Sequence, residues 1–353
     1  MNSLKCILLF VIVLSAYQIK GQVKYGAYYF DGWRPNSIHI TPKLKSVFSE
    51  REPIWGWETS SQEIVDAQIQ VAAEAGLRFF SFCWYAGNKS YLENKDNALA
   101  YYLNSPYESA LEFCLLVANH QGHLITPDNW DRCSEVWLKL FQQKTYLKLG
   151  GKPMLIFFSV GSLLQQFGSI KNVKNALEKL RQQALSLQLN GVMFGICTSN
   201  IKKEIELAEA MGFDIITQYN NHPIALNATP NLSVDINNLL DAEPKLWSAI
   251  KKETKLPVIP TITLNWDPRP WANNANKYDS KPYYTGFNSH SIYAAVINCN
   301  RWFQENRNNS LQEKIALIYA WNENGEGAYL TPTKKDGNKK LRALKKAISR
   351  NIK

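Results

Sequence analysis

The 353-residue sequence lacks the cysteine pattern of a disulfide-rich protein. It has six cysteines, none in a Cys-x-x-Cys pair, and Cys6 lies in an apolar segment near the N-terminus. The other five are Cys83, Cys114, Cys133, Cys197 and Cys299. Their number is odd, and several lie in apolar runs where cysteine behaves as a small hydrophobic residue. A disulfide scaffold is therefore excluded, although a single bridge remains open.

Several nucleotide-binding and catalytic motifs are missing as well. The sequence contains no Gly-x-x-x-x-Gly-Lys-Ser/Thr phosphate loop, no His-Glu-x-x-His zinc helix and no Gly-x-Ser-x-Gly nucleophile elbow. No Gly-x-Gly-x-x-Gly fingerprint follows a strand-like run. These absences argue against the chemistry that each motif serves.

Long hydrophobic runs are also missing beyond the N-terminus. Lys5 precedes an apolar run over residues 6–16, which is too short to span a bilayer comfortably and is typical of a secretory signal. We predict a signal peptide over residues 1–21, cut near Gly21; an N-terminal anchor is the alternative. The mature chain, residues 22–353, is then expected to be secreted or periplasmic, not inserted in a membrane, and monomeric.

The positive charge of the chain is concentrated at its two ends. The formal net charge is +10, and the predicted signal peptide holds two of the lysines. Residues 334–353 hold seven lysines, two arginines and one aspartate, so the body between is close to neutral. Nucleic-acid binding needs a basic stripe on the folded body. We therefore expect no nucleic-acid partner.

Short apolar runs alternate with amphipathic helical segments along the chain. Strands are expected at 24–30, 77–85, 111–119, 152–160, 191–199, 213–219, 257–264 and 314–321. Helices are expected at 60–76, 95–104, 131–149, 171–189, 201–211, 235–252, 290–306 and 338–350. Near-continuous apolar strands are typical of parallel sheets covered on both faces. Eight alternating pairs predict an α/β fold with one (β/α)8 TIM barrel; an open doubly wound sheet is the alternative.

The helix expected at 60–76 shows start and stop signals. Ser60 and Glu63 have the spacing of a capping box, and Gly76 is a helix-ending glycine. An inner stripe near period 3.6 is predicted for Ile64, Ala67, Ile69, Val71, Ala72 and Ala75.

Two glutamates follow the last predicted strand. Glu323 and Glu326 are three residues apart in a glycine-containing segment, flanked by Trp321 and Tyr329. Loops after barrel strands form the catalytic face of a TIM barrel. Two carboxyls placed there can divide acid and base roles when their environments separate their pKa values. The alternative is a polar loop whose glutamates cap the last helix or pair with lysine.

The segment around the two glutamates carries a family resemblance. WNENGEGAYLTP, residues 321–332, resembles the closing signature of glycoside hydrolase family 99 and of WbsX-type proteins. Other segments resemble family segments in the same order: GAYYFDGW at 26–33, QIQVAAEAGLRFFSFCWY at 68–85, LLVANHQG at 115–122, GKPMLIFF at 151–158 and PTITLNWDPRPW at 260–271. The resemblance extends over residues 24–332.

The resemblance implies a secreted, glycan-active barrel enzyme without metal or organic cofactor. Family 99 enzymes cut α-mannosidic linkages internally with retention of configuration. The first glutamate of their motif acts as base on the sugar's own 2-hydroxyl, and the second protonates the leaving oxygen. By this resemblance Glu323 is the base and Glu326 the general acid/base of a retaining α-glycoside hydrolase. Its substrate would be an α-mannan-like or related oligosaccharide or polysaccharide, which it would cleave internally (endo action).

The sequence departs from the family at positions that shape the pocket. Asn324 and Gly325 separate the two carboxyls, Thr331 replaces an acidic residue, Val117 replaces tryptophan, and His120 stands where glutamate is common. The resemblance therefore does not assign the sugar. Two alternatives stay open: a polysaccharide-biosynthesis glycosyltransferase of the WbsX type, and a non-catalytic glycan-binding protein.

Polar and aromatic side chains at the predicted strand ends are candidates for substrate binding. They are Tyr29, Trp84, Tyr85, Asn119, His120, Tyr219, Asp267, Arg269, Trp271, Trp321 and Asn322. Because side chains alternate along a strand, only one residue of Tyr28 and Tyr29 is expected to face the cleft, and the same holds for Trp84 and Tyr85. Barrel packing is the alternative for the rings, and a structural clamp for Asp267 with Arg269.

Overall fold

A computed structural model describes residues 22–87, 96–198, 201–309, 311 and 313–350. The predicted signal peptide lies outside the described residues. The central sheet contains β1 (Lys24–Tyr29), β2 (Phe79–Trp84), β3 (Glu112–Val117), β5 (Lys152–Phe157), β6 (Met193–Cys197), β7 (Ile215–Thr217), β9 (Thr261–Thr263) and β11 (Ile315–Tyr319). These strands pair in parallel, in the order β7-β6-β5-β3-β2-β1-β11-β9. Each of the eight predicted strands is confirmed within its expected range.

The segment before β9 brings the two ends of the sheet together. Ile216 of β7 forms a parallel bridge with Val258. The amide of Ile216 donates to the carbonyl of Pro257 at 3.0 Å, and the amide of Ile259 donates to the carbonyl of Ile216 at 2.9 Å. The sheet therefore forms the predicted (β/α)8 barrel, and the open sheet is wrong.

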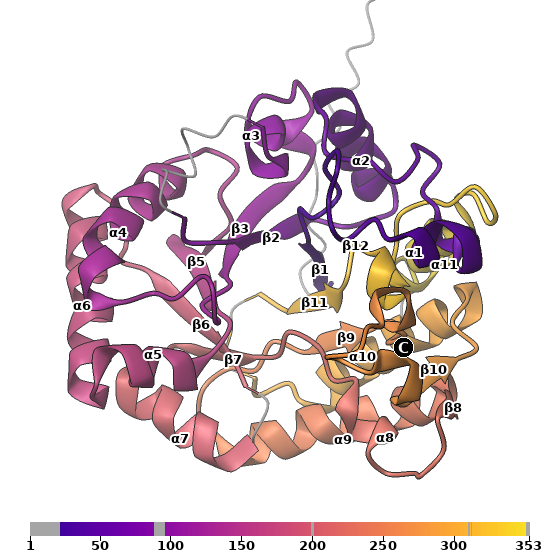
Figure 1. Ribbon diagram of the computed structural model, residues 1–353. Helices are drawn as coiled ribbons and strands as arrows, with labels where there is room; N and C mark the ends of the chain where they lie inside the picture. The colour runs from indigo at the N-terminus through magenta and orange to yellow at the C-terminus, as the bar shows by residue number, and fades with distance from the viewer. Residues whose placement is uncertain (1–21, 88–95, 199–200, 310, 312, 351–353) are drawn as a thin grey trace, which may run out of the picture.

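Helices surround this ring of strands (Figure 1). They are α2 (Gln62–Glu74), α3 (Ala98–Leu103), α4 (Pro127–Phe141), α5 (Val160–Phe167), α6 (Ile170–Ser186), α7 (Ile201–Met211), α9 (Ile236–Glu253), α10 (Ser289–Glu305) and α11 (Lys339–Ile348). Their apolar faces pack on the strands, so the main core lies between the two layers. Among the described residues, no helix is long and apolar enough to cross a membrane.

Two helix predictions needed correction. The helix expected at 131–149 runs over Pro127–Phe141, because Thr126 and Asn129 form a capping box and proline is favoured at the first helical position. The end of the expected range is instead β4 (Lys148–Leu149), which pairs antiparallel with β5.

The second correction concerns helix α2. The predicted capping box makes Ser60 the N-cap, but the N-cap is Ser61, so the helix begins one residue later. The hydroxyl of Ser60 donates to Asp31 Oδ1 at 2.6 Å, and the N-cap is Ser61 without a side-chain bond. The buried positions are Val65, Gln68, Ile69 and Ala72, so the predicted stripe is only partly confirmed. Gly76 has φ +95°, as expected for a helix-ending glycine.

The long loops carry short elements that the sequence did not predict. They are α1 (Pro42–Val47), η1 (Ser49–Arg51), η2 (Glu108–Ala110), α8 (Pro223–Leu226), β8 (Ser233–Asp235), η3 (Arg269–Trp271), η4 (Tyr278–Ser280) and β10 (Tyr283–Thr285). After β11 follow β12 (Asn322–Glu323), η5 (Asn324–Glu326) and β13 (Ala328–Tyr329). Most of them follow the carboxyl ends of barrel strands, which is the side where barrel enzymes build their sites.

Candidate active site

The chain leaving β11 is fixed by its own side chains. The indole nitrogen of Trp321 donates to Gln68 Oε1 at 2.6 Å, and its ring packs on Phe80. The side chain of Asn322 accepts from the amide of Phe30 at 2.8 Å and donates to the same residue's carbonyl at 2.7 Å. Trp321 and Asn322 are buried. They therefore hold the strand end in place, and their predicted contact with a substrate stays a prediction.

Glu323 is buried directly after this anchor, with 4% of its surface exposed. Its Oε1 accepts a hydrogen bond from the Tyr219 hydroxyl at 2.9 Å. Its Oε2 is buried and has no hydrogen-bond partner in the described part of the chain. Burial raises the pKa of Glu323 to about 7, against the lowering effect of the Tyr219 bond. A carboxyl with this pKa can take up or release a proton near neutrality.

Glu326 lies one turn further, in η5, and keeps part of its surface exposed. Its surroundings nonetheless desolvate the carboxyl, and this burial raises the pKa of Glu326 to about 8. No hydrogen bond or ion pair reaches its carboxylate from the described residues. Glu326 therefore carries its proton at neutral pH, as a general acid must.

The two carboxyls share neighbours inside the barrel. The charges of both Glu323 and Glu326 raise the pKa of the Tyr219 hydroxyl and of the Cys83 thiol, although burial is the largest cause in each case. Cys83 Sγ lies 3.9 Å from the Tyr219 hydroxyl. The pKa of Tyr278, in η4, is raised by burial and by the charge of Glu326. Strands β2 and β11 and the segments after β7 and β9 thus converge around the pair.

The glutamate loop is packed too closely to accept a larger residue at Gly325. A Cβ there would lie 2.1 Å from Cζ2 of Trp271. Trp271 in turn donates its indole nitrogen to the carbonyl of His39 at 2.9 Å and remains partly exposed. The ring of Trp271 thus packs against the glutamate loop. That Trp271 also binds the substrate stays a prediction.

Asp267 and Arg269 form the clamp that was the alternative to substrate binding. Arg269 donates from Nε to Asp267 Oδ1 at 2.7 Å and from Nη2 to Oδ2 at 3.0 Å. Its guanidinium also lies 3.5 Å from the centroid of the Tyr283 ring. Asp267 is buried and also pairs with Arg51, a residue that the sequence analysis missed. Asp267 therefore pairs with two arginines, and its predicted contact with a sugar stays a prediction.

Three predicted residues form an aromatic path at the barrel mouth. The Tyr219 ring lies 5.4 Å from Phe158, which lies 5.9 Å from His120. His120 lies 6.1 Å from Tyr85. Tyr219 and Tyr85 are partly exposed and His120 is exposed. These positions suit stacking and hydrogen bonding to a sugar, and Tyr219 links them to Glu323.

Three other residues that were predicted to bind substrate, Tyr29, Trp84 and Asn119, lie in the core. Tyr29 is 1% exposed and packs between Phe80 and Phe82. Trp84 packs edge-on against Trp137.

The third is Asn119, which is fully buried. Its Oδ1 accepts from the amides of Phe158 and Ser159, and its Nδ2 donates to the carbonyl of Ser159. Direct contact of Tyr29, Trp84 or Asn119 with a substrate is therefore not supported.

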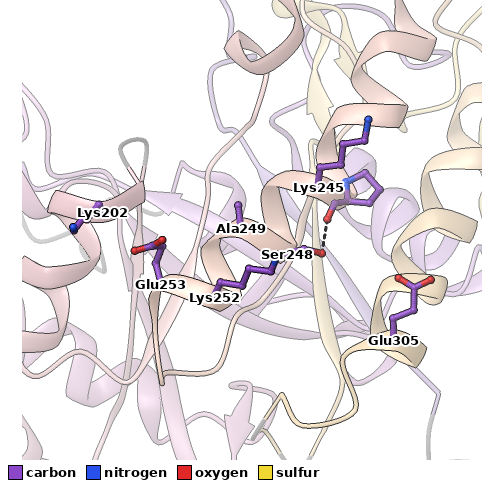
Figure 2. Close-up of a pocket in the computed structure, with 8 residues that line it drawn as sticks. Lys202, Lys245, Ser248, Ala249, Lys252, Glu253 and Glu305 are labelled. Carbon is purple, nitrogen blue, oxygen red and sulfur yellow. Dashed lines mark hydrogen bonds between the residues drawn. The ribbon is translucent and has the colours of Figure 1, made fainter.

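A hollow of about 630 Å³ lies elsewhere, on the outside of the barrel (Figure 2). It is lined by Lys202 of α7, by one face of α9 from Pro244 to Glu253, and by Glu305 of α10. Its two acidic residues come from different helices and are accompanied by three lysines. We place the chemistry at the glutamate pair instead, because burial raises the pKa of both Glu323 and Glu326, three residues apart in one loop. Within the described chain, no group of three histidine, cysteine, aspartate or glutamate side chains could hold a metal ion.

Comparisons with known proteins agree with this architecture. The model of the family described as "Glycosyltransferase WbsX" matches residues 56–344. A glycoside hydrolase-like protein of known structure is 15% identical, with a TM-score of 0.62 and coverage of 95% of this chain and 96% of that chain. A family GH99 endo-alpha-mannosidase from Bacteroides thetaiotaomicron is 12% identical, with a TM-score of 0.59 and coverage of 92% and 95%. No curated protein sequence matches. At these identities the solved structures show a shared fold alone.

Proposed function

The chain belongs to the WbsX family, and from that premise we propose that it is a secreted retaining α-glycoside hydrolase acting within an α-mannan-like or related glycan. The observation that supports this most is the pair of adjacent desolvated carboxyls, Glu323 and Glu326, after the last barrel strand. The fold shared with glycoside hydrolases, the predicted signal peptide and the aromatic mouth are consistent with it.

Glu323 is the proposed base. Tyr219 occupies Oε1 and favours the ionised form, while Oε2 has no partner in the described chain. An unpaired buried oxygen costs about 1–3 kcal/mol, and a hydroxyl donated by a ligand would recover part of that cost. In the proposed first step Oε2 takes the proton of the sugar 2-hydroxyl. The 2-oxygen then bonds to the anomeric carbon as the glycosidic bond breaks.

Glu326 is the proposed acid/base. Burial keeps its proton in place at neutral pH, and the residue keeps part of its surface exposed, from which we propose that it reaches a leaving oxygen. It gives its proton to that oxygen in the first step. In the second step it takes a proton from water, whose oxygen bonds to the anomeric carbon and opens the 1,2-anhydro sugar. Glu323 returns its proton to the 2-oxygen, so both groups end as they began.

A substrate screen tests the activity. Purified protein is incubated with α-mannans and other polysaccharides, and products are identified by mass. We expect oligosaccharides from the wild type and none from Glu326→Gln. A panel on which the wild type binds glycans but releases no reducing ends would favour a non-catalytic binding protein.

Modified substrates test the participating hydroxyl separately. A 2-deoxy or 2-O-methyl sugar lacks the proton that Glu323 removes, so it should be inert at the scissile position. Normal cleavage of either sugar would show that the 2-hydroxyl does not participate, even if the protein is a hydrolase.

A glycosyltransferase is the second candidate, and the name of the matching family, glycosyltransferase WbsX, favours it. The same carboxyl pair could pass the glycosyl group to an acceptor hydroxyl instead of water. Isothermal titration with nucleotide sugars separates the two: saturable binding, followed by product elongation in place of cleavage, would reverse our ranking.

A further inference from the structure

Arg51 lies behind the glutamate loop with 5% of its surface exposed. It ends η1, and its guanidinium stacks 4.4 Å from the centroid of the Phe48 ring. Nη2 pairs with the carboxylate of Asp267, and Nη1 donates to the carbonyl of the same residue at 2.9 Å. Arginine suits this role because its rigid fork can serve several acceptors at once.

Nη1 of Arg51 also reaches the glutamate loop itself. It lies 3.4 Å from the carbonyl oxygen of Asn324 and 3.4 Å from that of Gly325, the two residues before Glu326. In return, Nδ2 of Asn324 donates to the carbonyl of Arg51 at 2.8 Å. The amide of Asp267 donates to the carbonyl of Glu326 at 2.7 Å. Arg51 and Asp267 thus hold every residue of η5 by its backbone or side chain.

The charges of this cluster offset one another. Asp267 pairs with both Arg51 and Arg269, and Glu50 Oε1 lies 3.6 Å from Nε of Arg51. Two cations and two anions therefore lie together in this cluster.

Among the described residues, the charge of Glu326 raises the pKa of Cys83 on β2, Tyr219 after β7 and Tyr278 in η4. Glu323 lies in the same loop. None of these supplies a positive charge. Glu326 is thus held through its loop by an arginine whose guanidinium is paired with Asp267.

We propose that Arg51 is a positioning residue for Glu326: it fixes the acid through the carbonyls of its loop, while Asp267 neutralises the guanidinium. This inference rests on the proposed function of Glu326 as the general acid. Two effects can therefore be measured separately. Loss of Arg51 should displace the Glu326 carboxyl, whereas loss of Asp267 should leave the positive charge of Arg51 without its partner.

The charge effect is measured without substrate. Glutamate Cδ is labelled with ¹³C, and the Glu326 signal is assigned by its absence in Glu326→Gln. Asp267→Asn should lower the titration midpoint of Glu326 by about half to one pH unit, as expected for an unpaired cation nearby. The double variant with Arg51→Met and Asp267→Asn should return the midpoint toward that of the wild type, since the nearest cation is gone.

The positioning effect is measured by kinetics. Arg51→Met should lower kcat by about 10- to 100-fold with little change in KM, because a misplaced acid fails mainly in the transition state. Arg51→Lys keeps the charge but not the fork and should recover only part of the loss. The double variant should stay slow although its Glu326 midpoint is restored.

A matched pair elsewhere supplies the control. Arg181 pairs with Asp214 at 2.9 Å, donates to the carbonyl of Gly212 at 2.6 Å and stacks on a phenylalanine ring, but Asp214 precedes β7 at the opposite end of the barrel. Arg181→Met and Asp214→Asn should lower the unfolding temperature and leave both kcat and the Glu326 midpoint unchanged.

The outcomes separate the inference from the proposed function. A Glu326 midpoint that does not move in Asp267→Asn, or that moves equally in Asp214→Asn, overturns the inference. If Asp267→Asn does not fold, Arg51→Lys and the double variant decide: full kcat in either one also overturns it. If the midpoint shifts as expected but the wild type cleaves no glycan, the proposed function fails while the charge arrangement stands.

Discussion

The pH dependence of activity follows from the two burial-shifted carboxyls. Glu323 must be ionised to act as base, so activity is lost as pH falls below its pKa of about 7. Glu326 must be protonated to act as acid, so activity is lost as pH rises above its pKa of about 8. The profile of kcat/KM is therefore expected to be bell-shaped, with its maximum near pH 7.5.

The two pKa values determine how far kcat/KM falls away from its maximum. With pKa values of about 7 and about 8, the fraction of molecules with the correct protonation is about 60% at pH 7.5. At pH 5.5 it is about 3%, so kcat/KM should fall about 20-fold. Initial rates on one soluble oligosaccharide over pH 4.5–9.5 measure this, with circular dichroism at each pH as the check on folding. Full activity at pH 5.5, or a maximum between pH 4 and 5, would refute the reasoning from burial.

Three further substitutions test the parts of the site. Tyr219→Phe removes the hydrogen bond to Glu323 Oε1, so it should raise the pKa of Glu323 and move the acidic limb of the bell to higher pH; Tyr146→Phe, which loses one buried bond to a backbone carbonyl, should leave the limb in place. Gly325→Ala should reduce kcat by 10-fold or more because its Cβ would overlap Trp271, whereas Gly161→Ala, where only Ser159 Oγ lies within 4 Å, should be nearly silent in the same assay. Glu323→Gln removes a carboxyl whose pKa is raised from 4.5 to about 7 in the folded state, so it destabilises the fold increasingly as pH rises from about 4.5 to about 7, and fully above that. The variant should be more stable than the wild type at pH 8.5, by up to about 3 kcal/mol, and not at pH 4.5. Denaturant titration at the two pH values measures this, and equal stability at pH 8.5 would show that the charge of Glu323 is well solvated.

The barrel could be predicted from the sequence because its strands are buried on both faces. Such strands are continuous apolar runs, as in 152–160, and their alternation with amphipathic helices is unambiguous. The short pair β8 and β10 could not be predicted in this way. Its residues are mostly exposed or half-buried, and its pairing joins segments about fifty residues apart.

The sequence does not determine which side chain at the end of a strand points into the barrel. The sequence shows Tyr28 and Tyr29 side by side, and a shift of one residue in register exchanges their faces. The structure turns Tyr28 inward, where its ring lies 5.1 Å from Tyr219, and packs Tyr29 outward against Phe80. In the same way, Trp84 is buried in the core, whereas its neighbour Tyr85 is partly exposed at the mouth of the barrel.

The sequence shows which loop residues are charged, but not which other residues they pair with. Asp267 and Arg269 were singled out, yet Arg51 was not, because nothing local marks one arginine in the long 31–59 loop. The hydrogen-bond acceptors of its guanidinium, Asp267 and the glutamate loop, lie more than two hundred residues away along the chain. The glutamate pair was found through its motif, whereas the raised pKa values depend on burial that only the folded chain supplies.

The central claim is that Glu326 protonates the leaving group of a glycosidic bond. It is tested most directly by comparing Glu326→Gln with the wild type on an unactivated oligosaccharide and on an aryl glycoside of the same sugar with a good leaving group. We predict that the variant loses the oligosaccharide reaction by at least 10²-fold, the size of a general-acid contribution, and retains a substantial share of the aryl glycoside reaction. Equal losses on the two substrates would contradict the account.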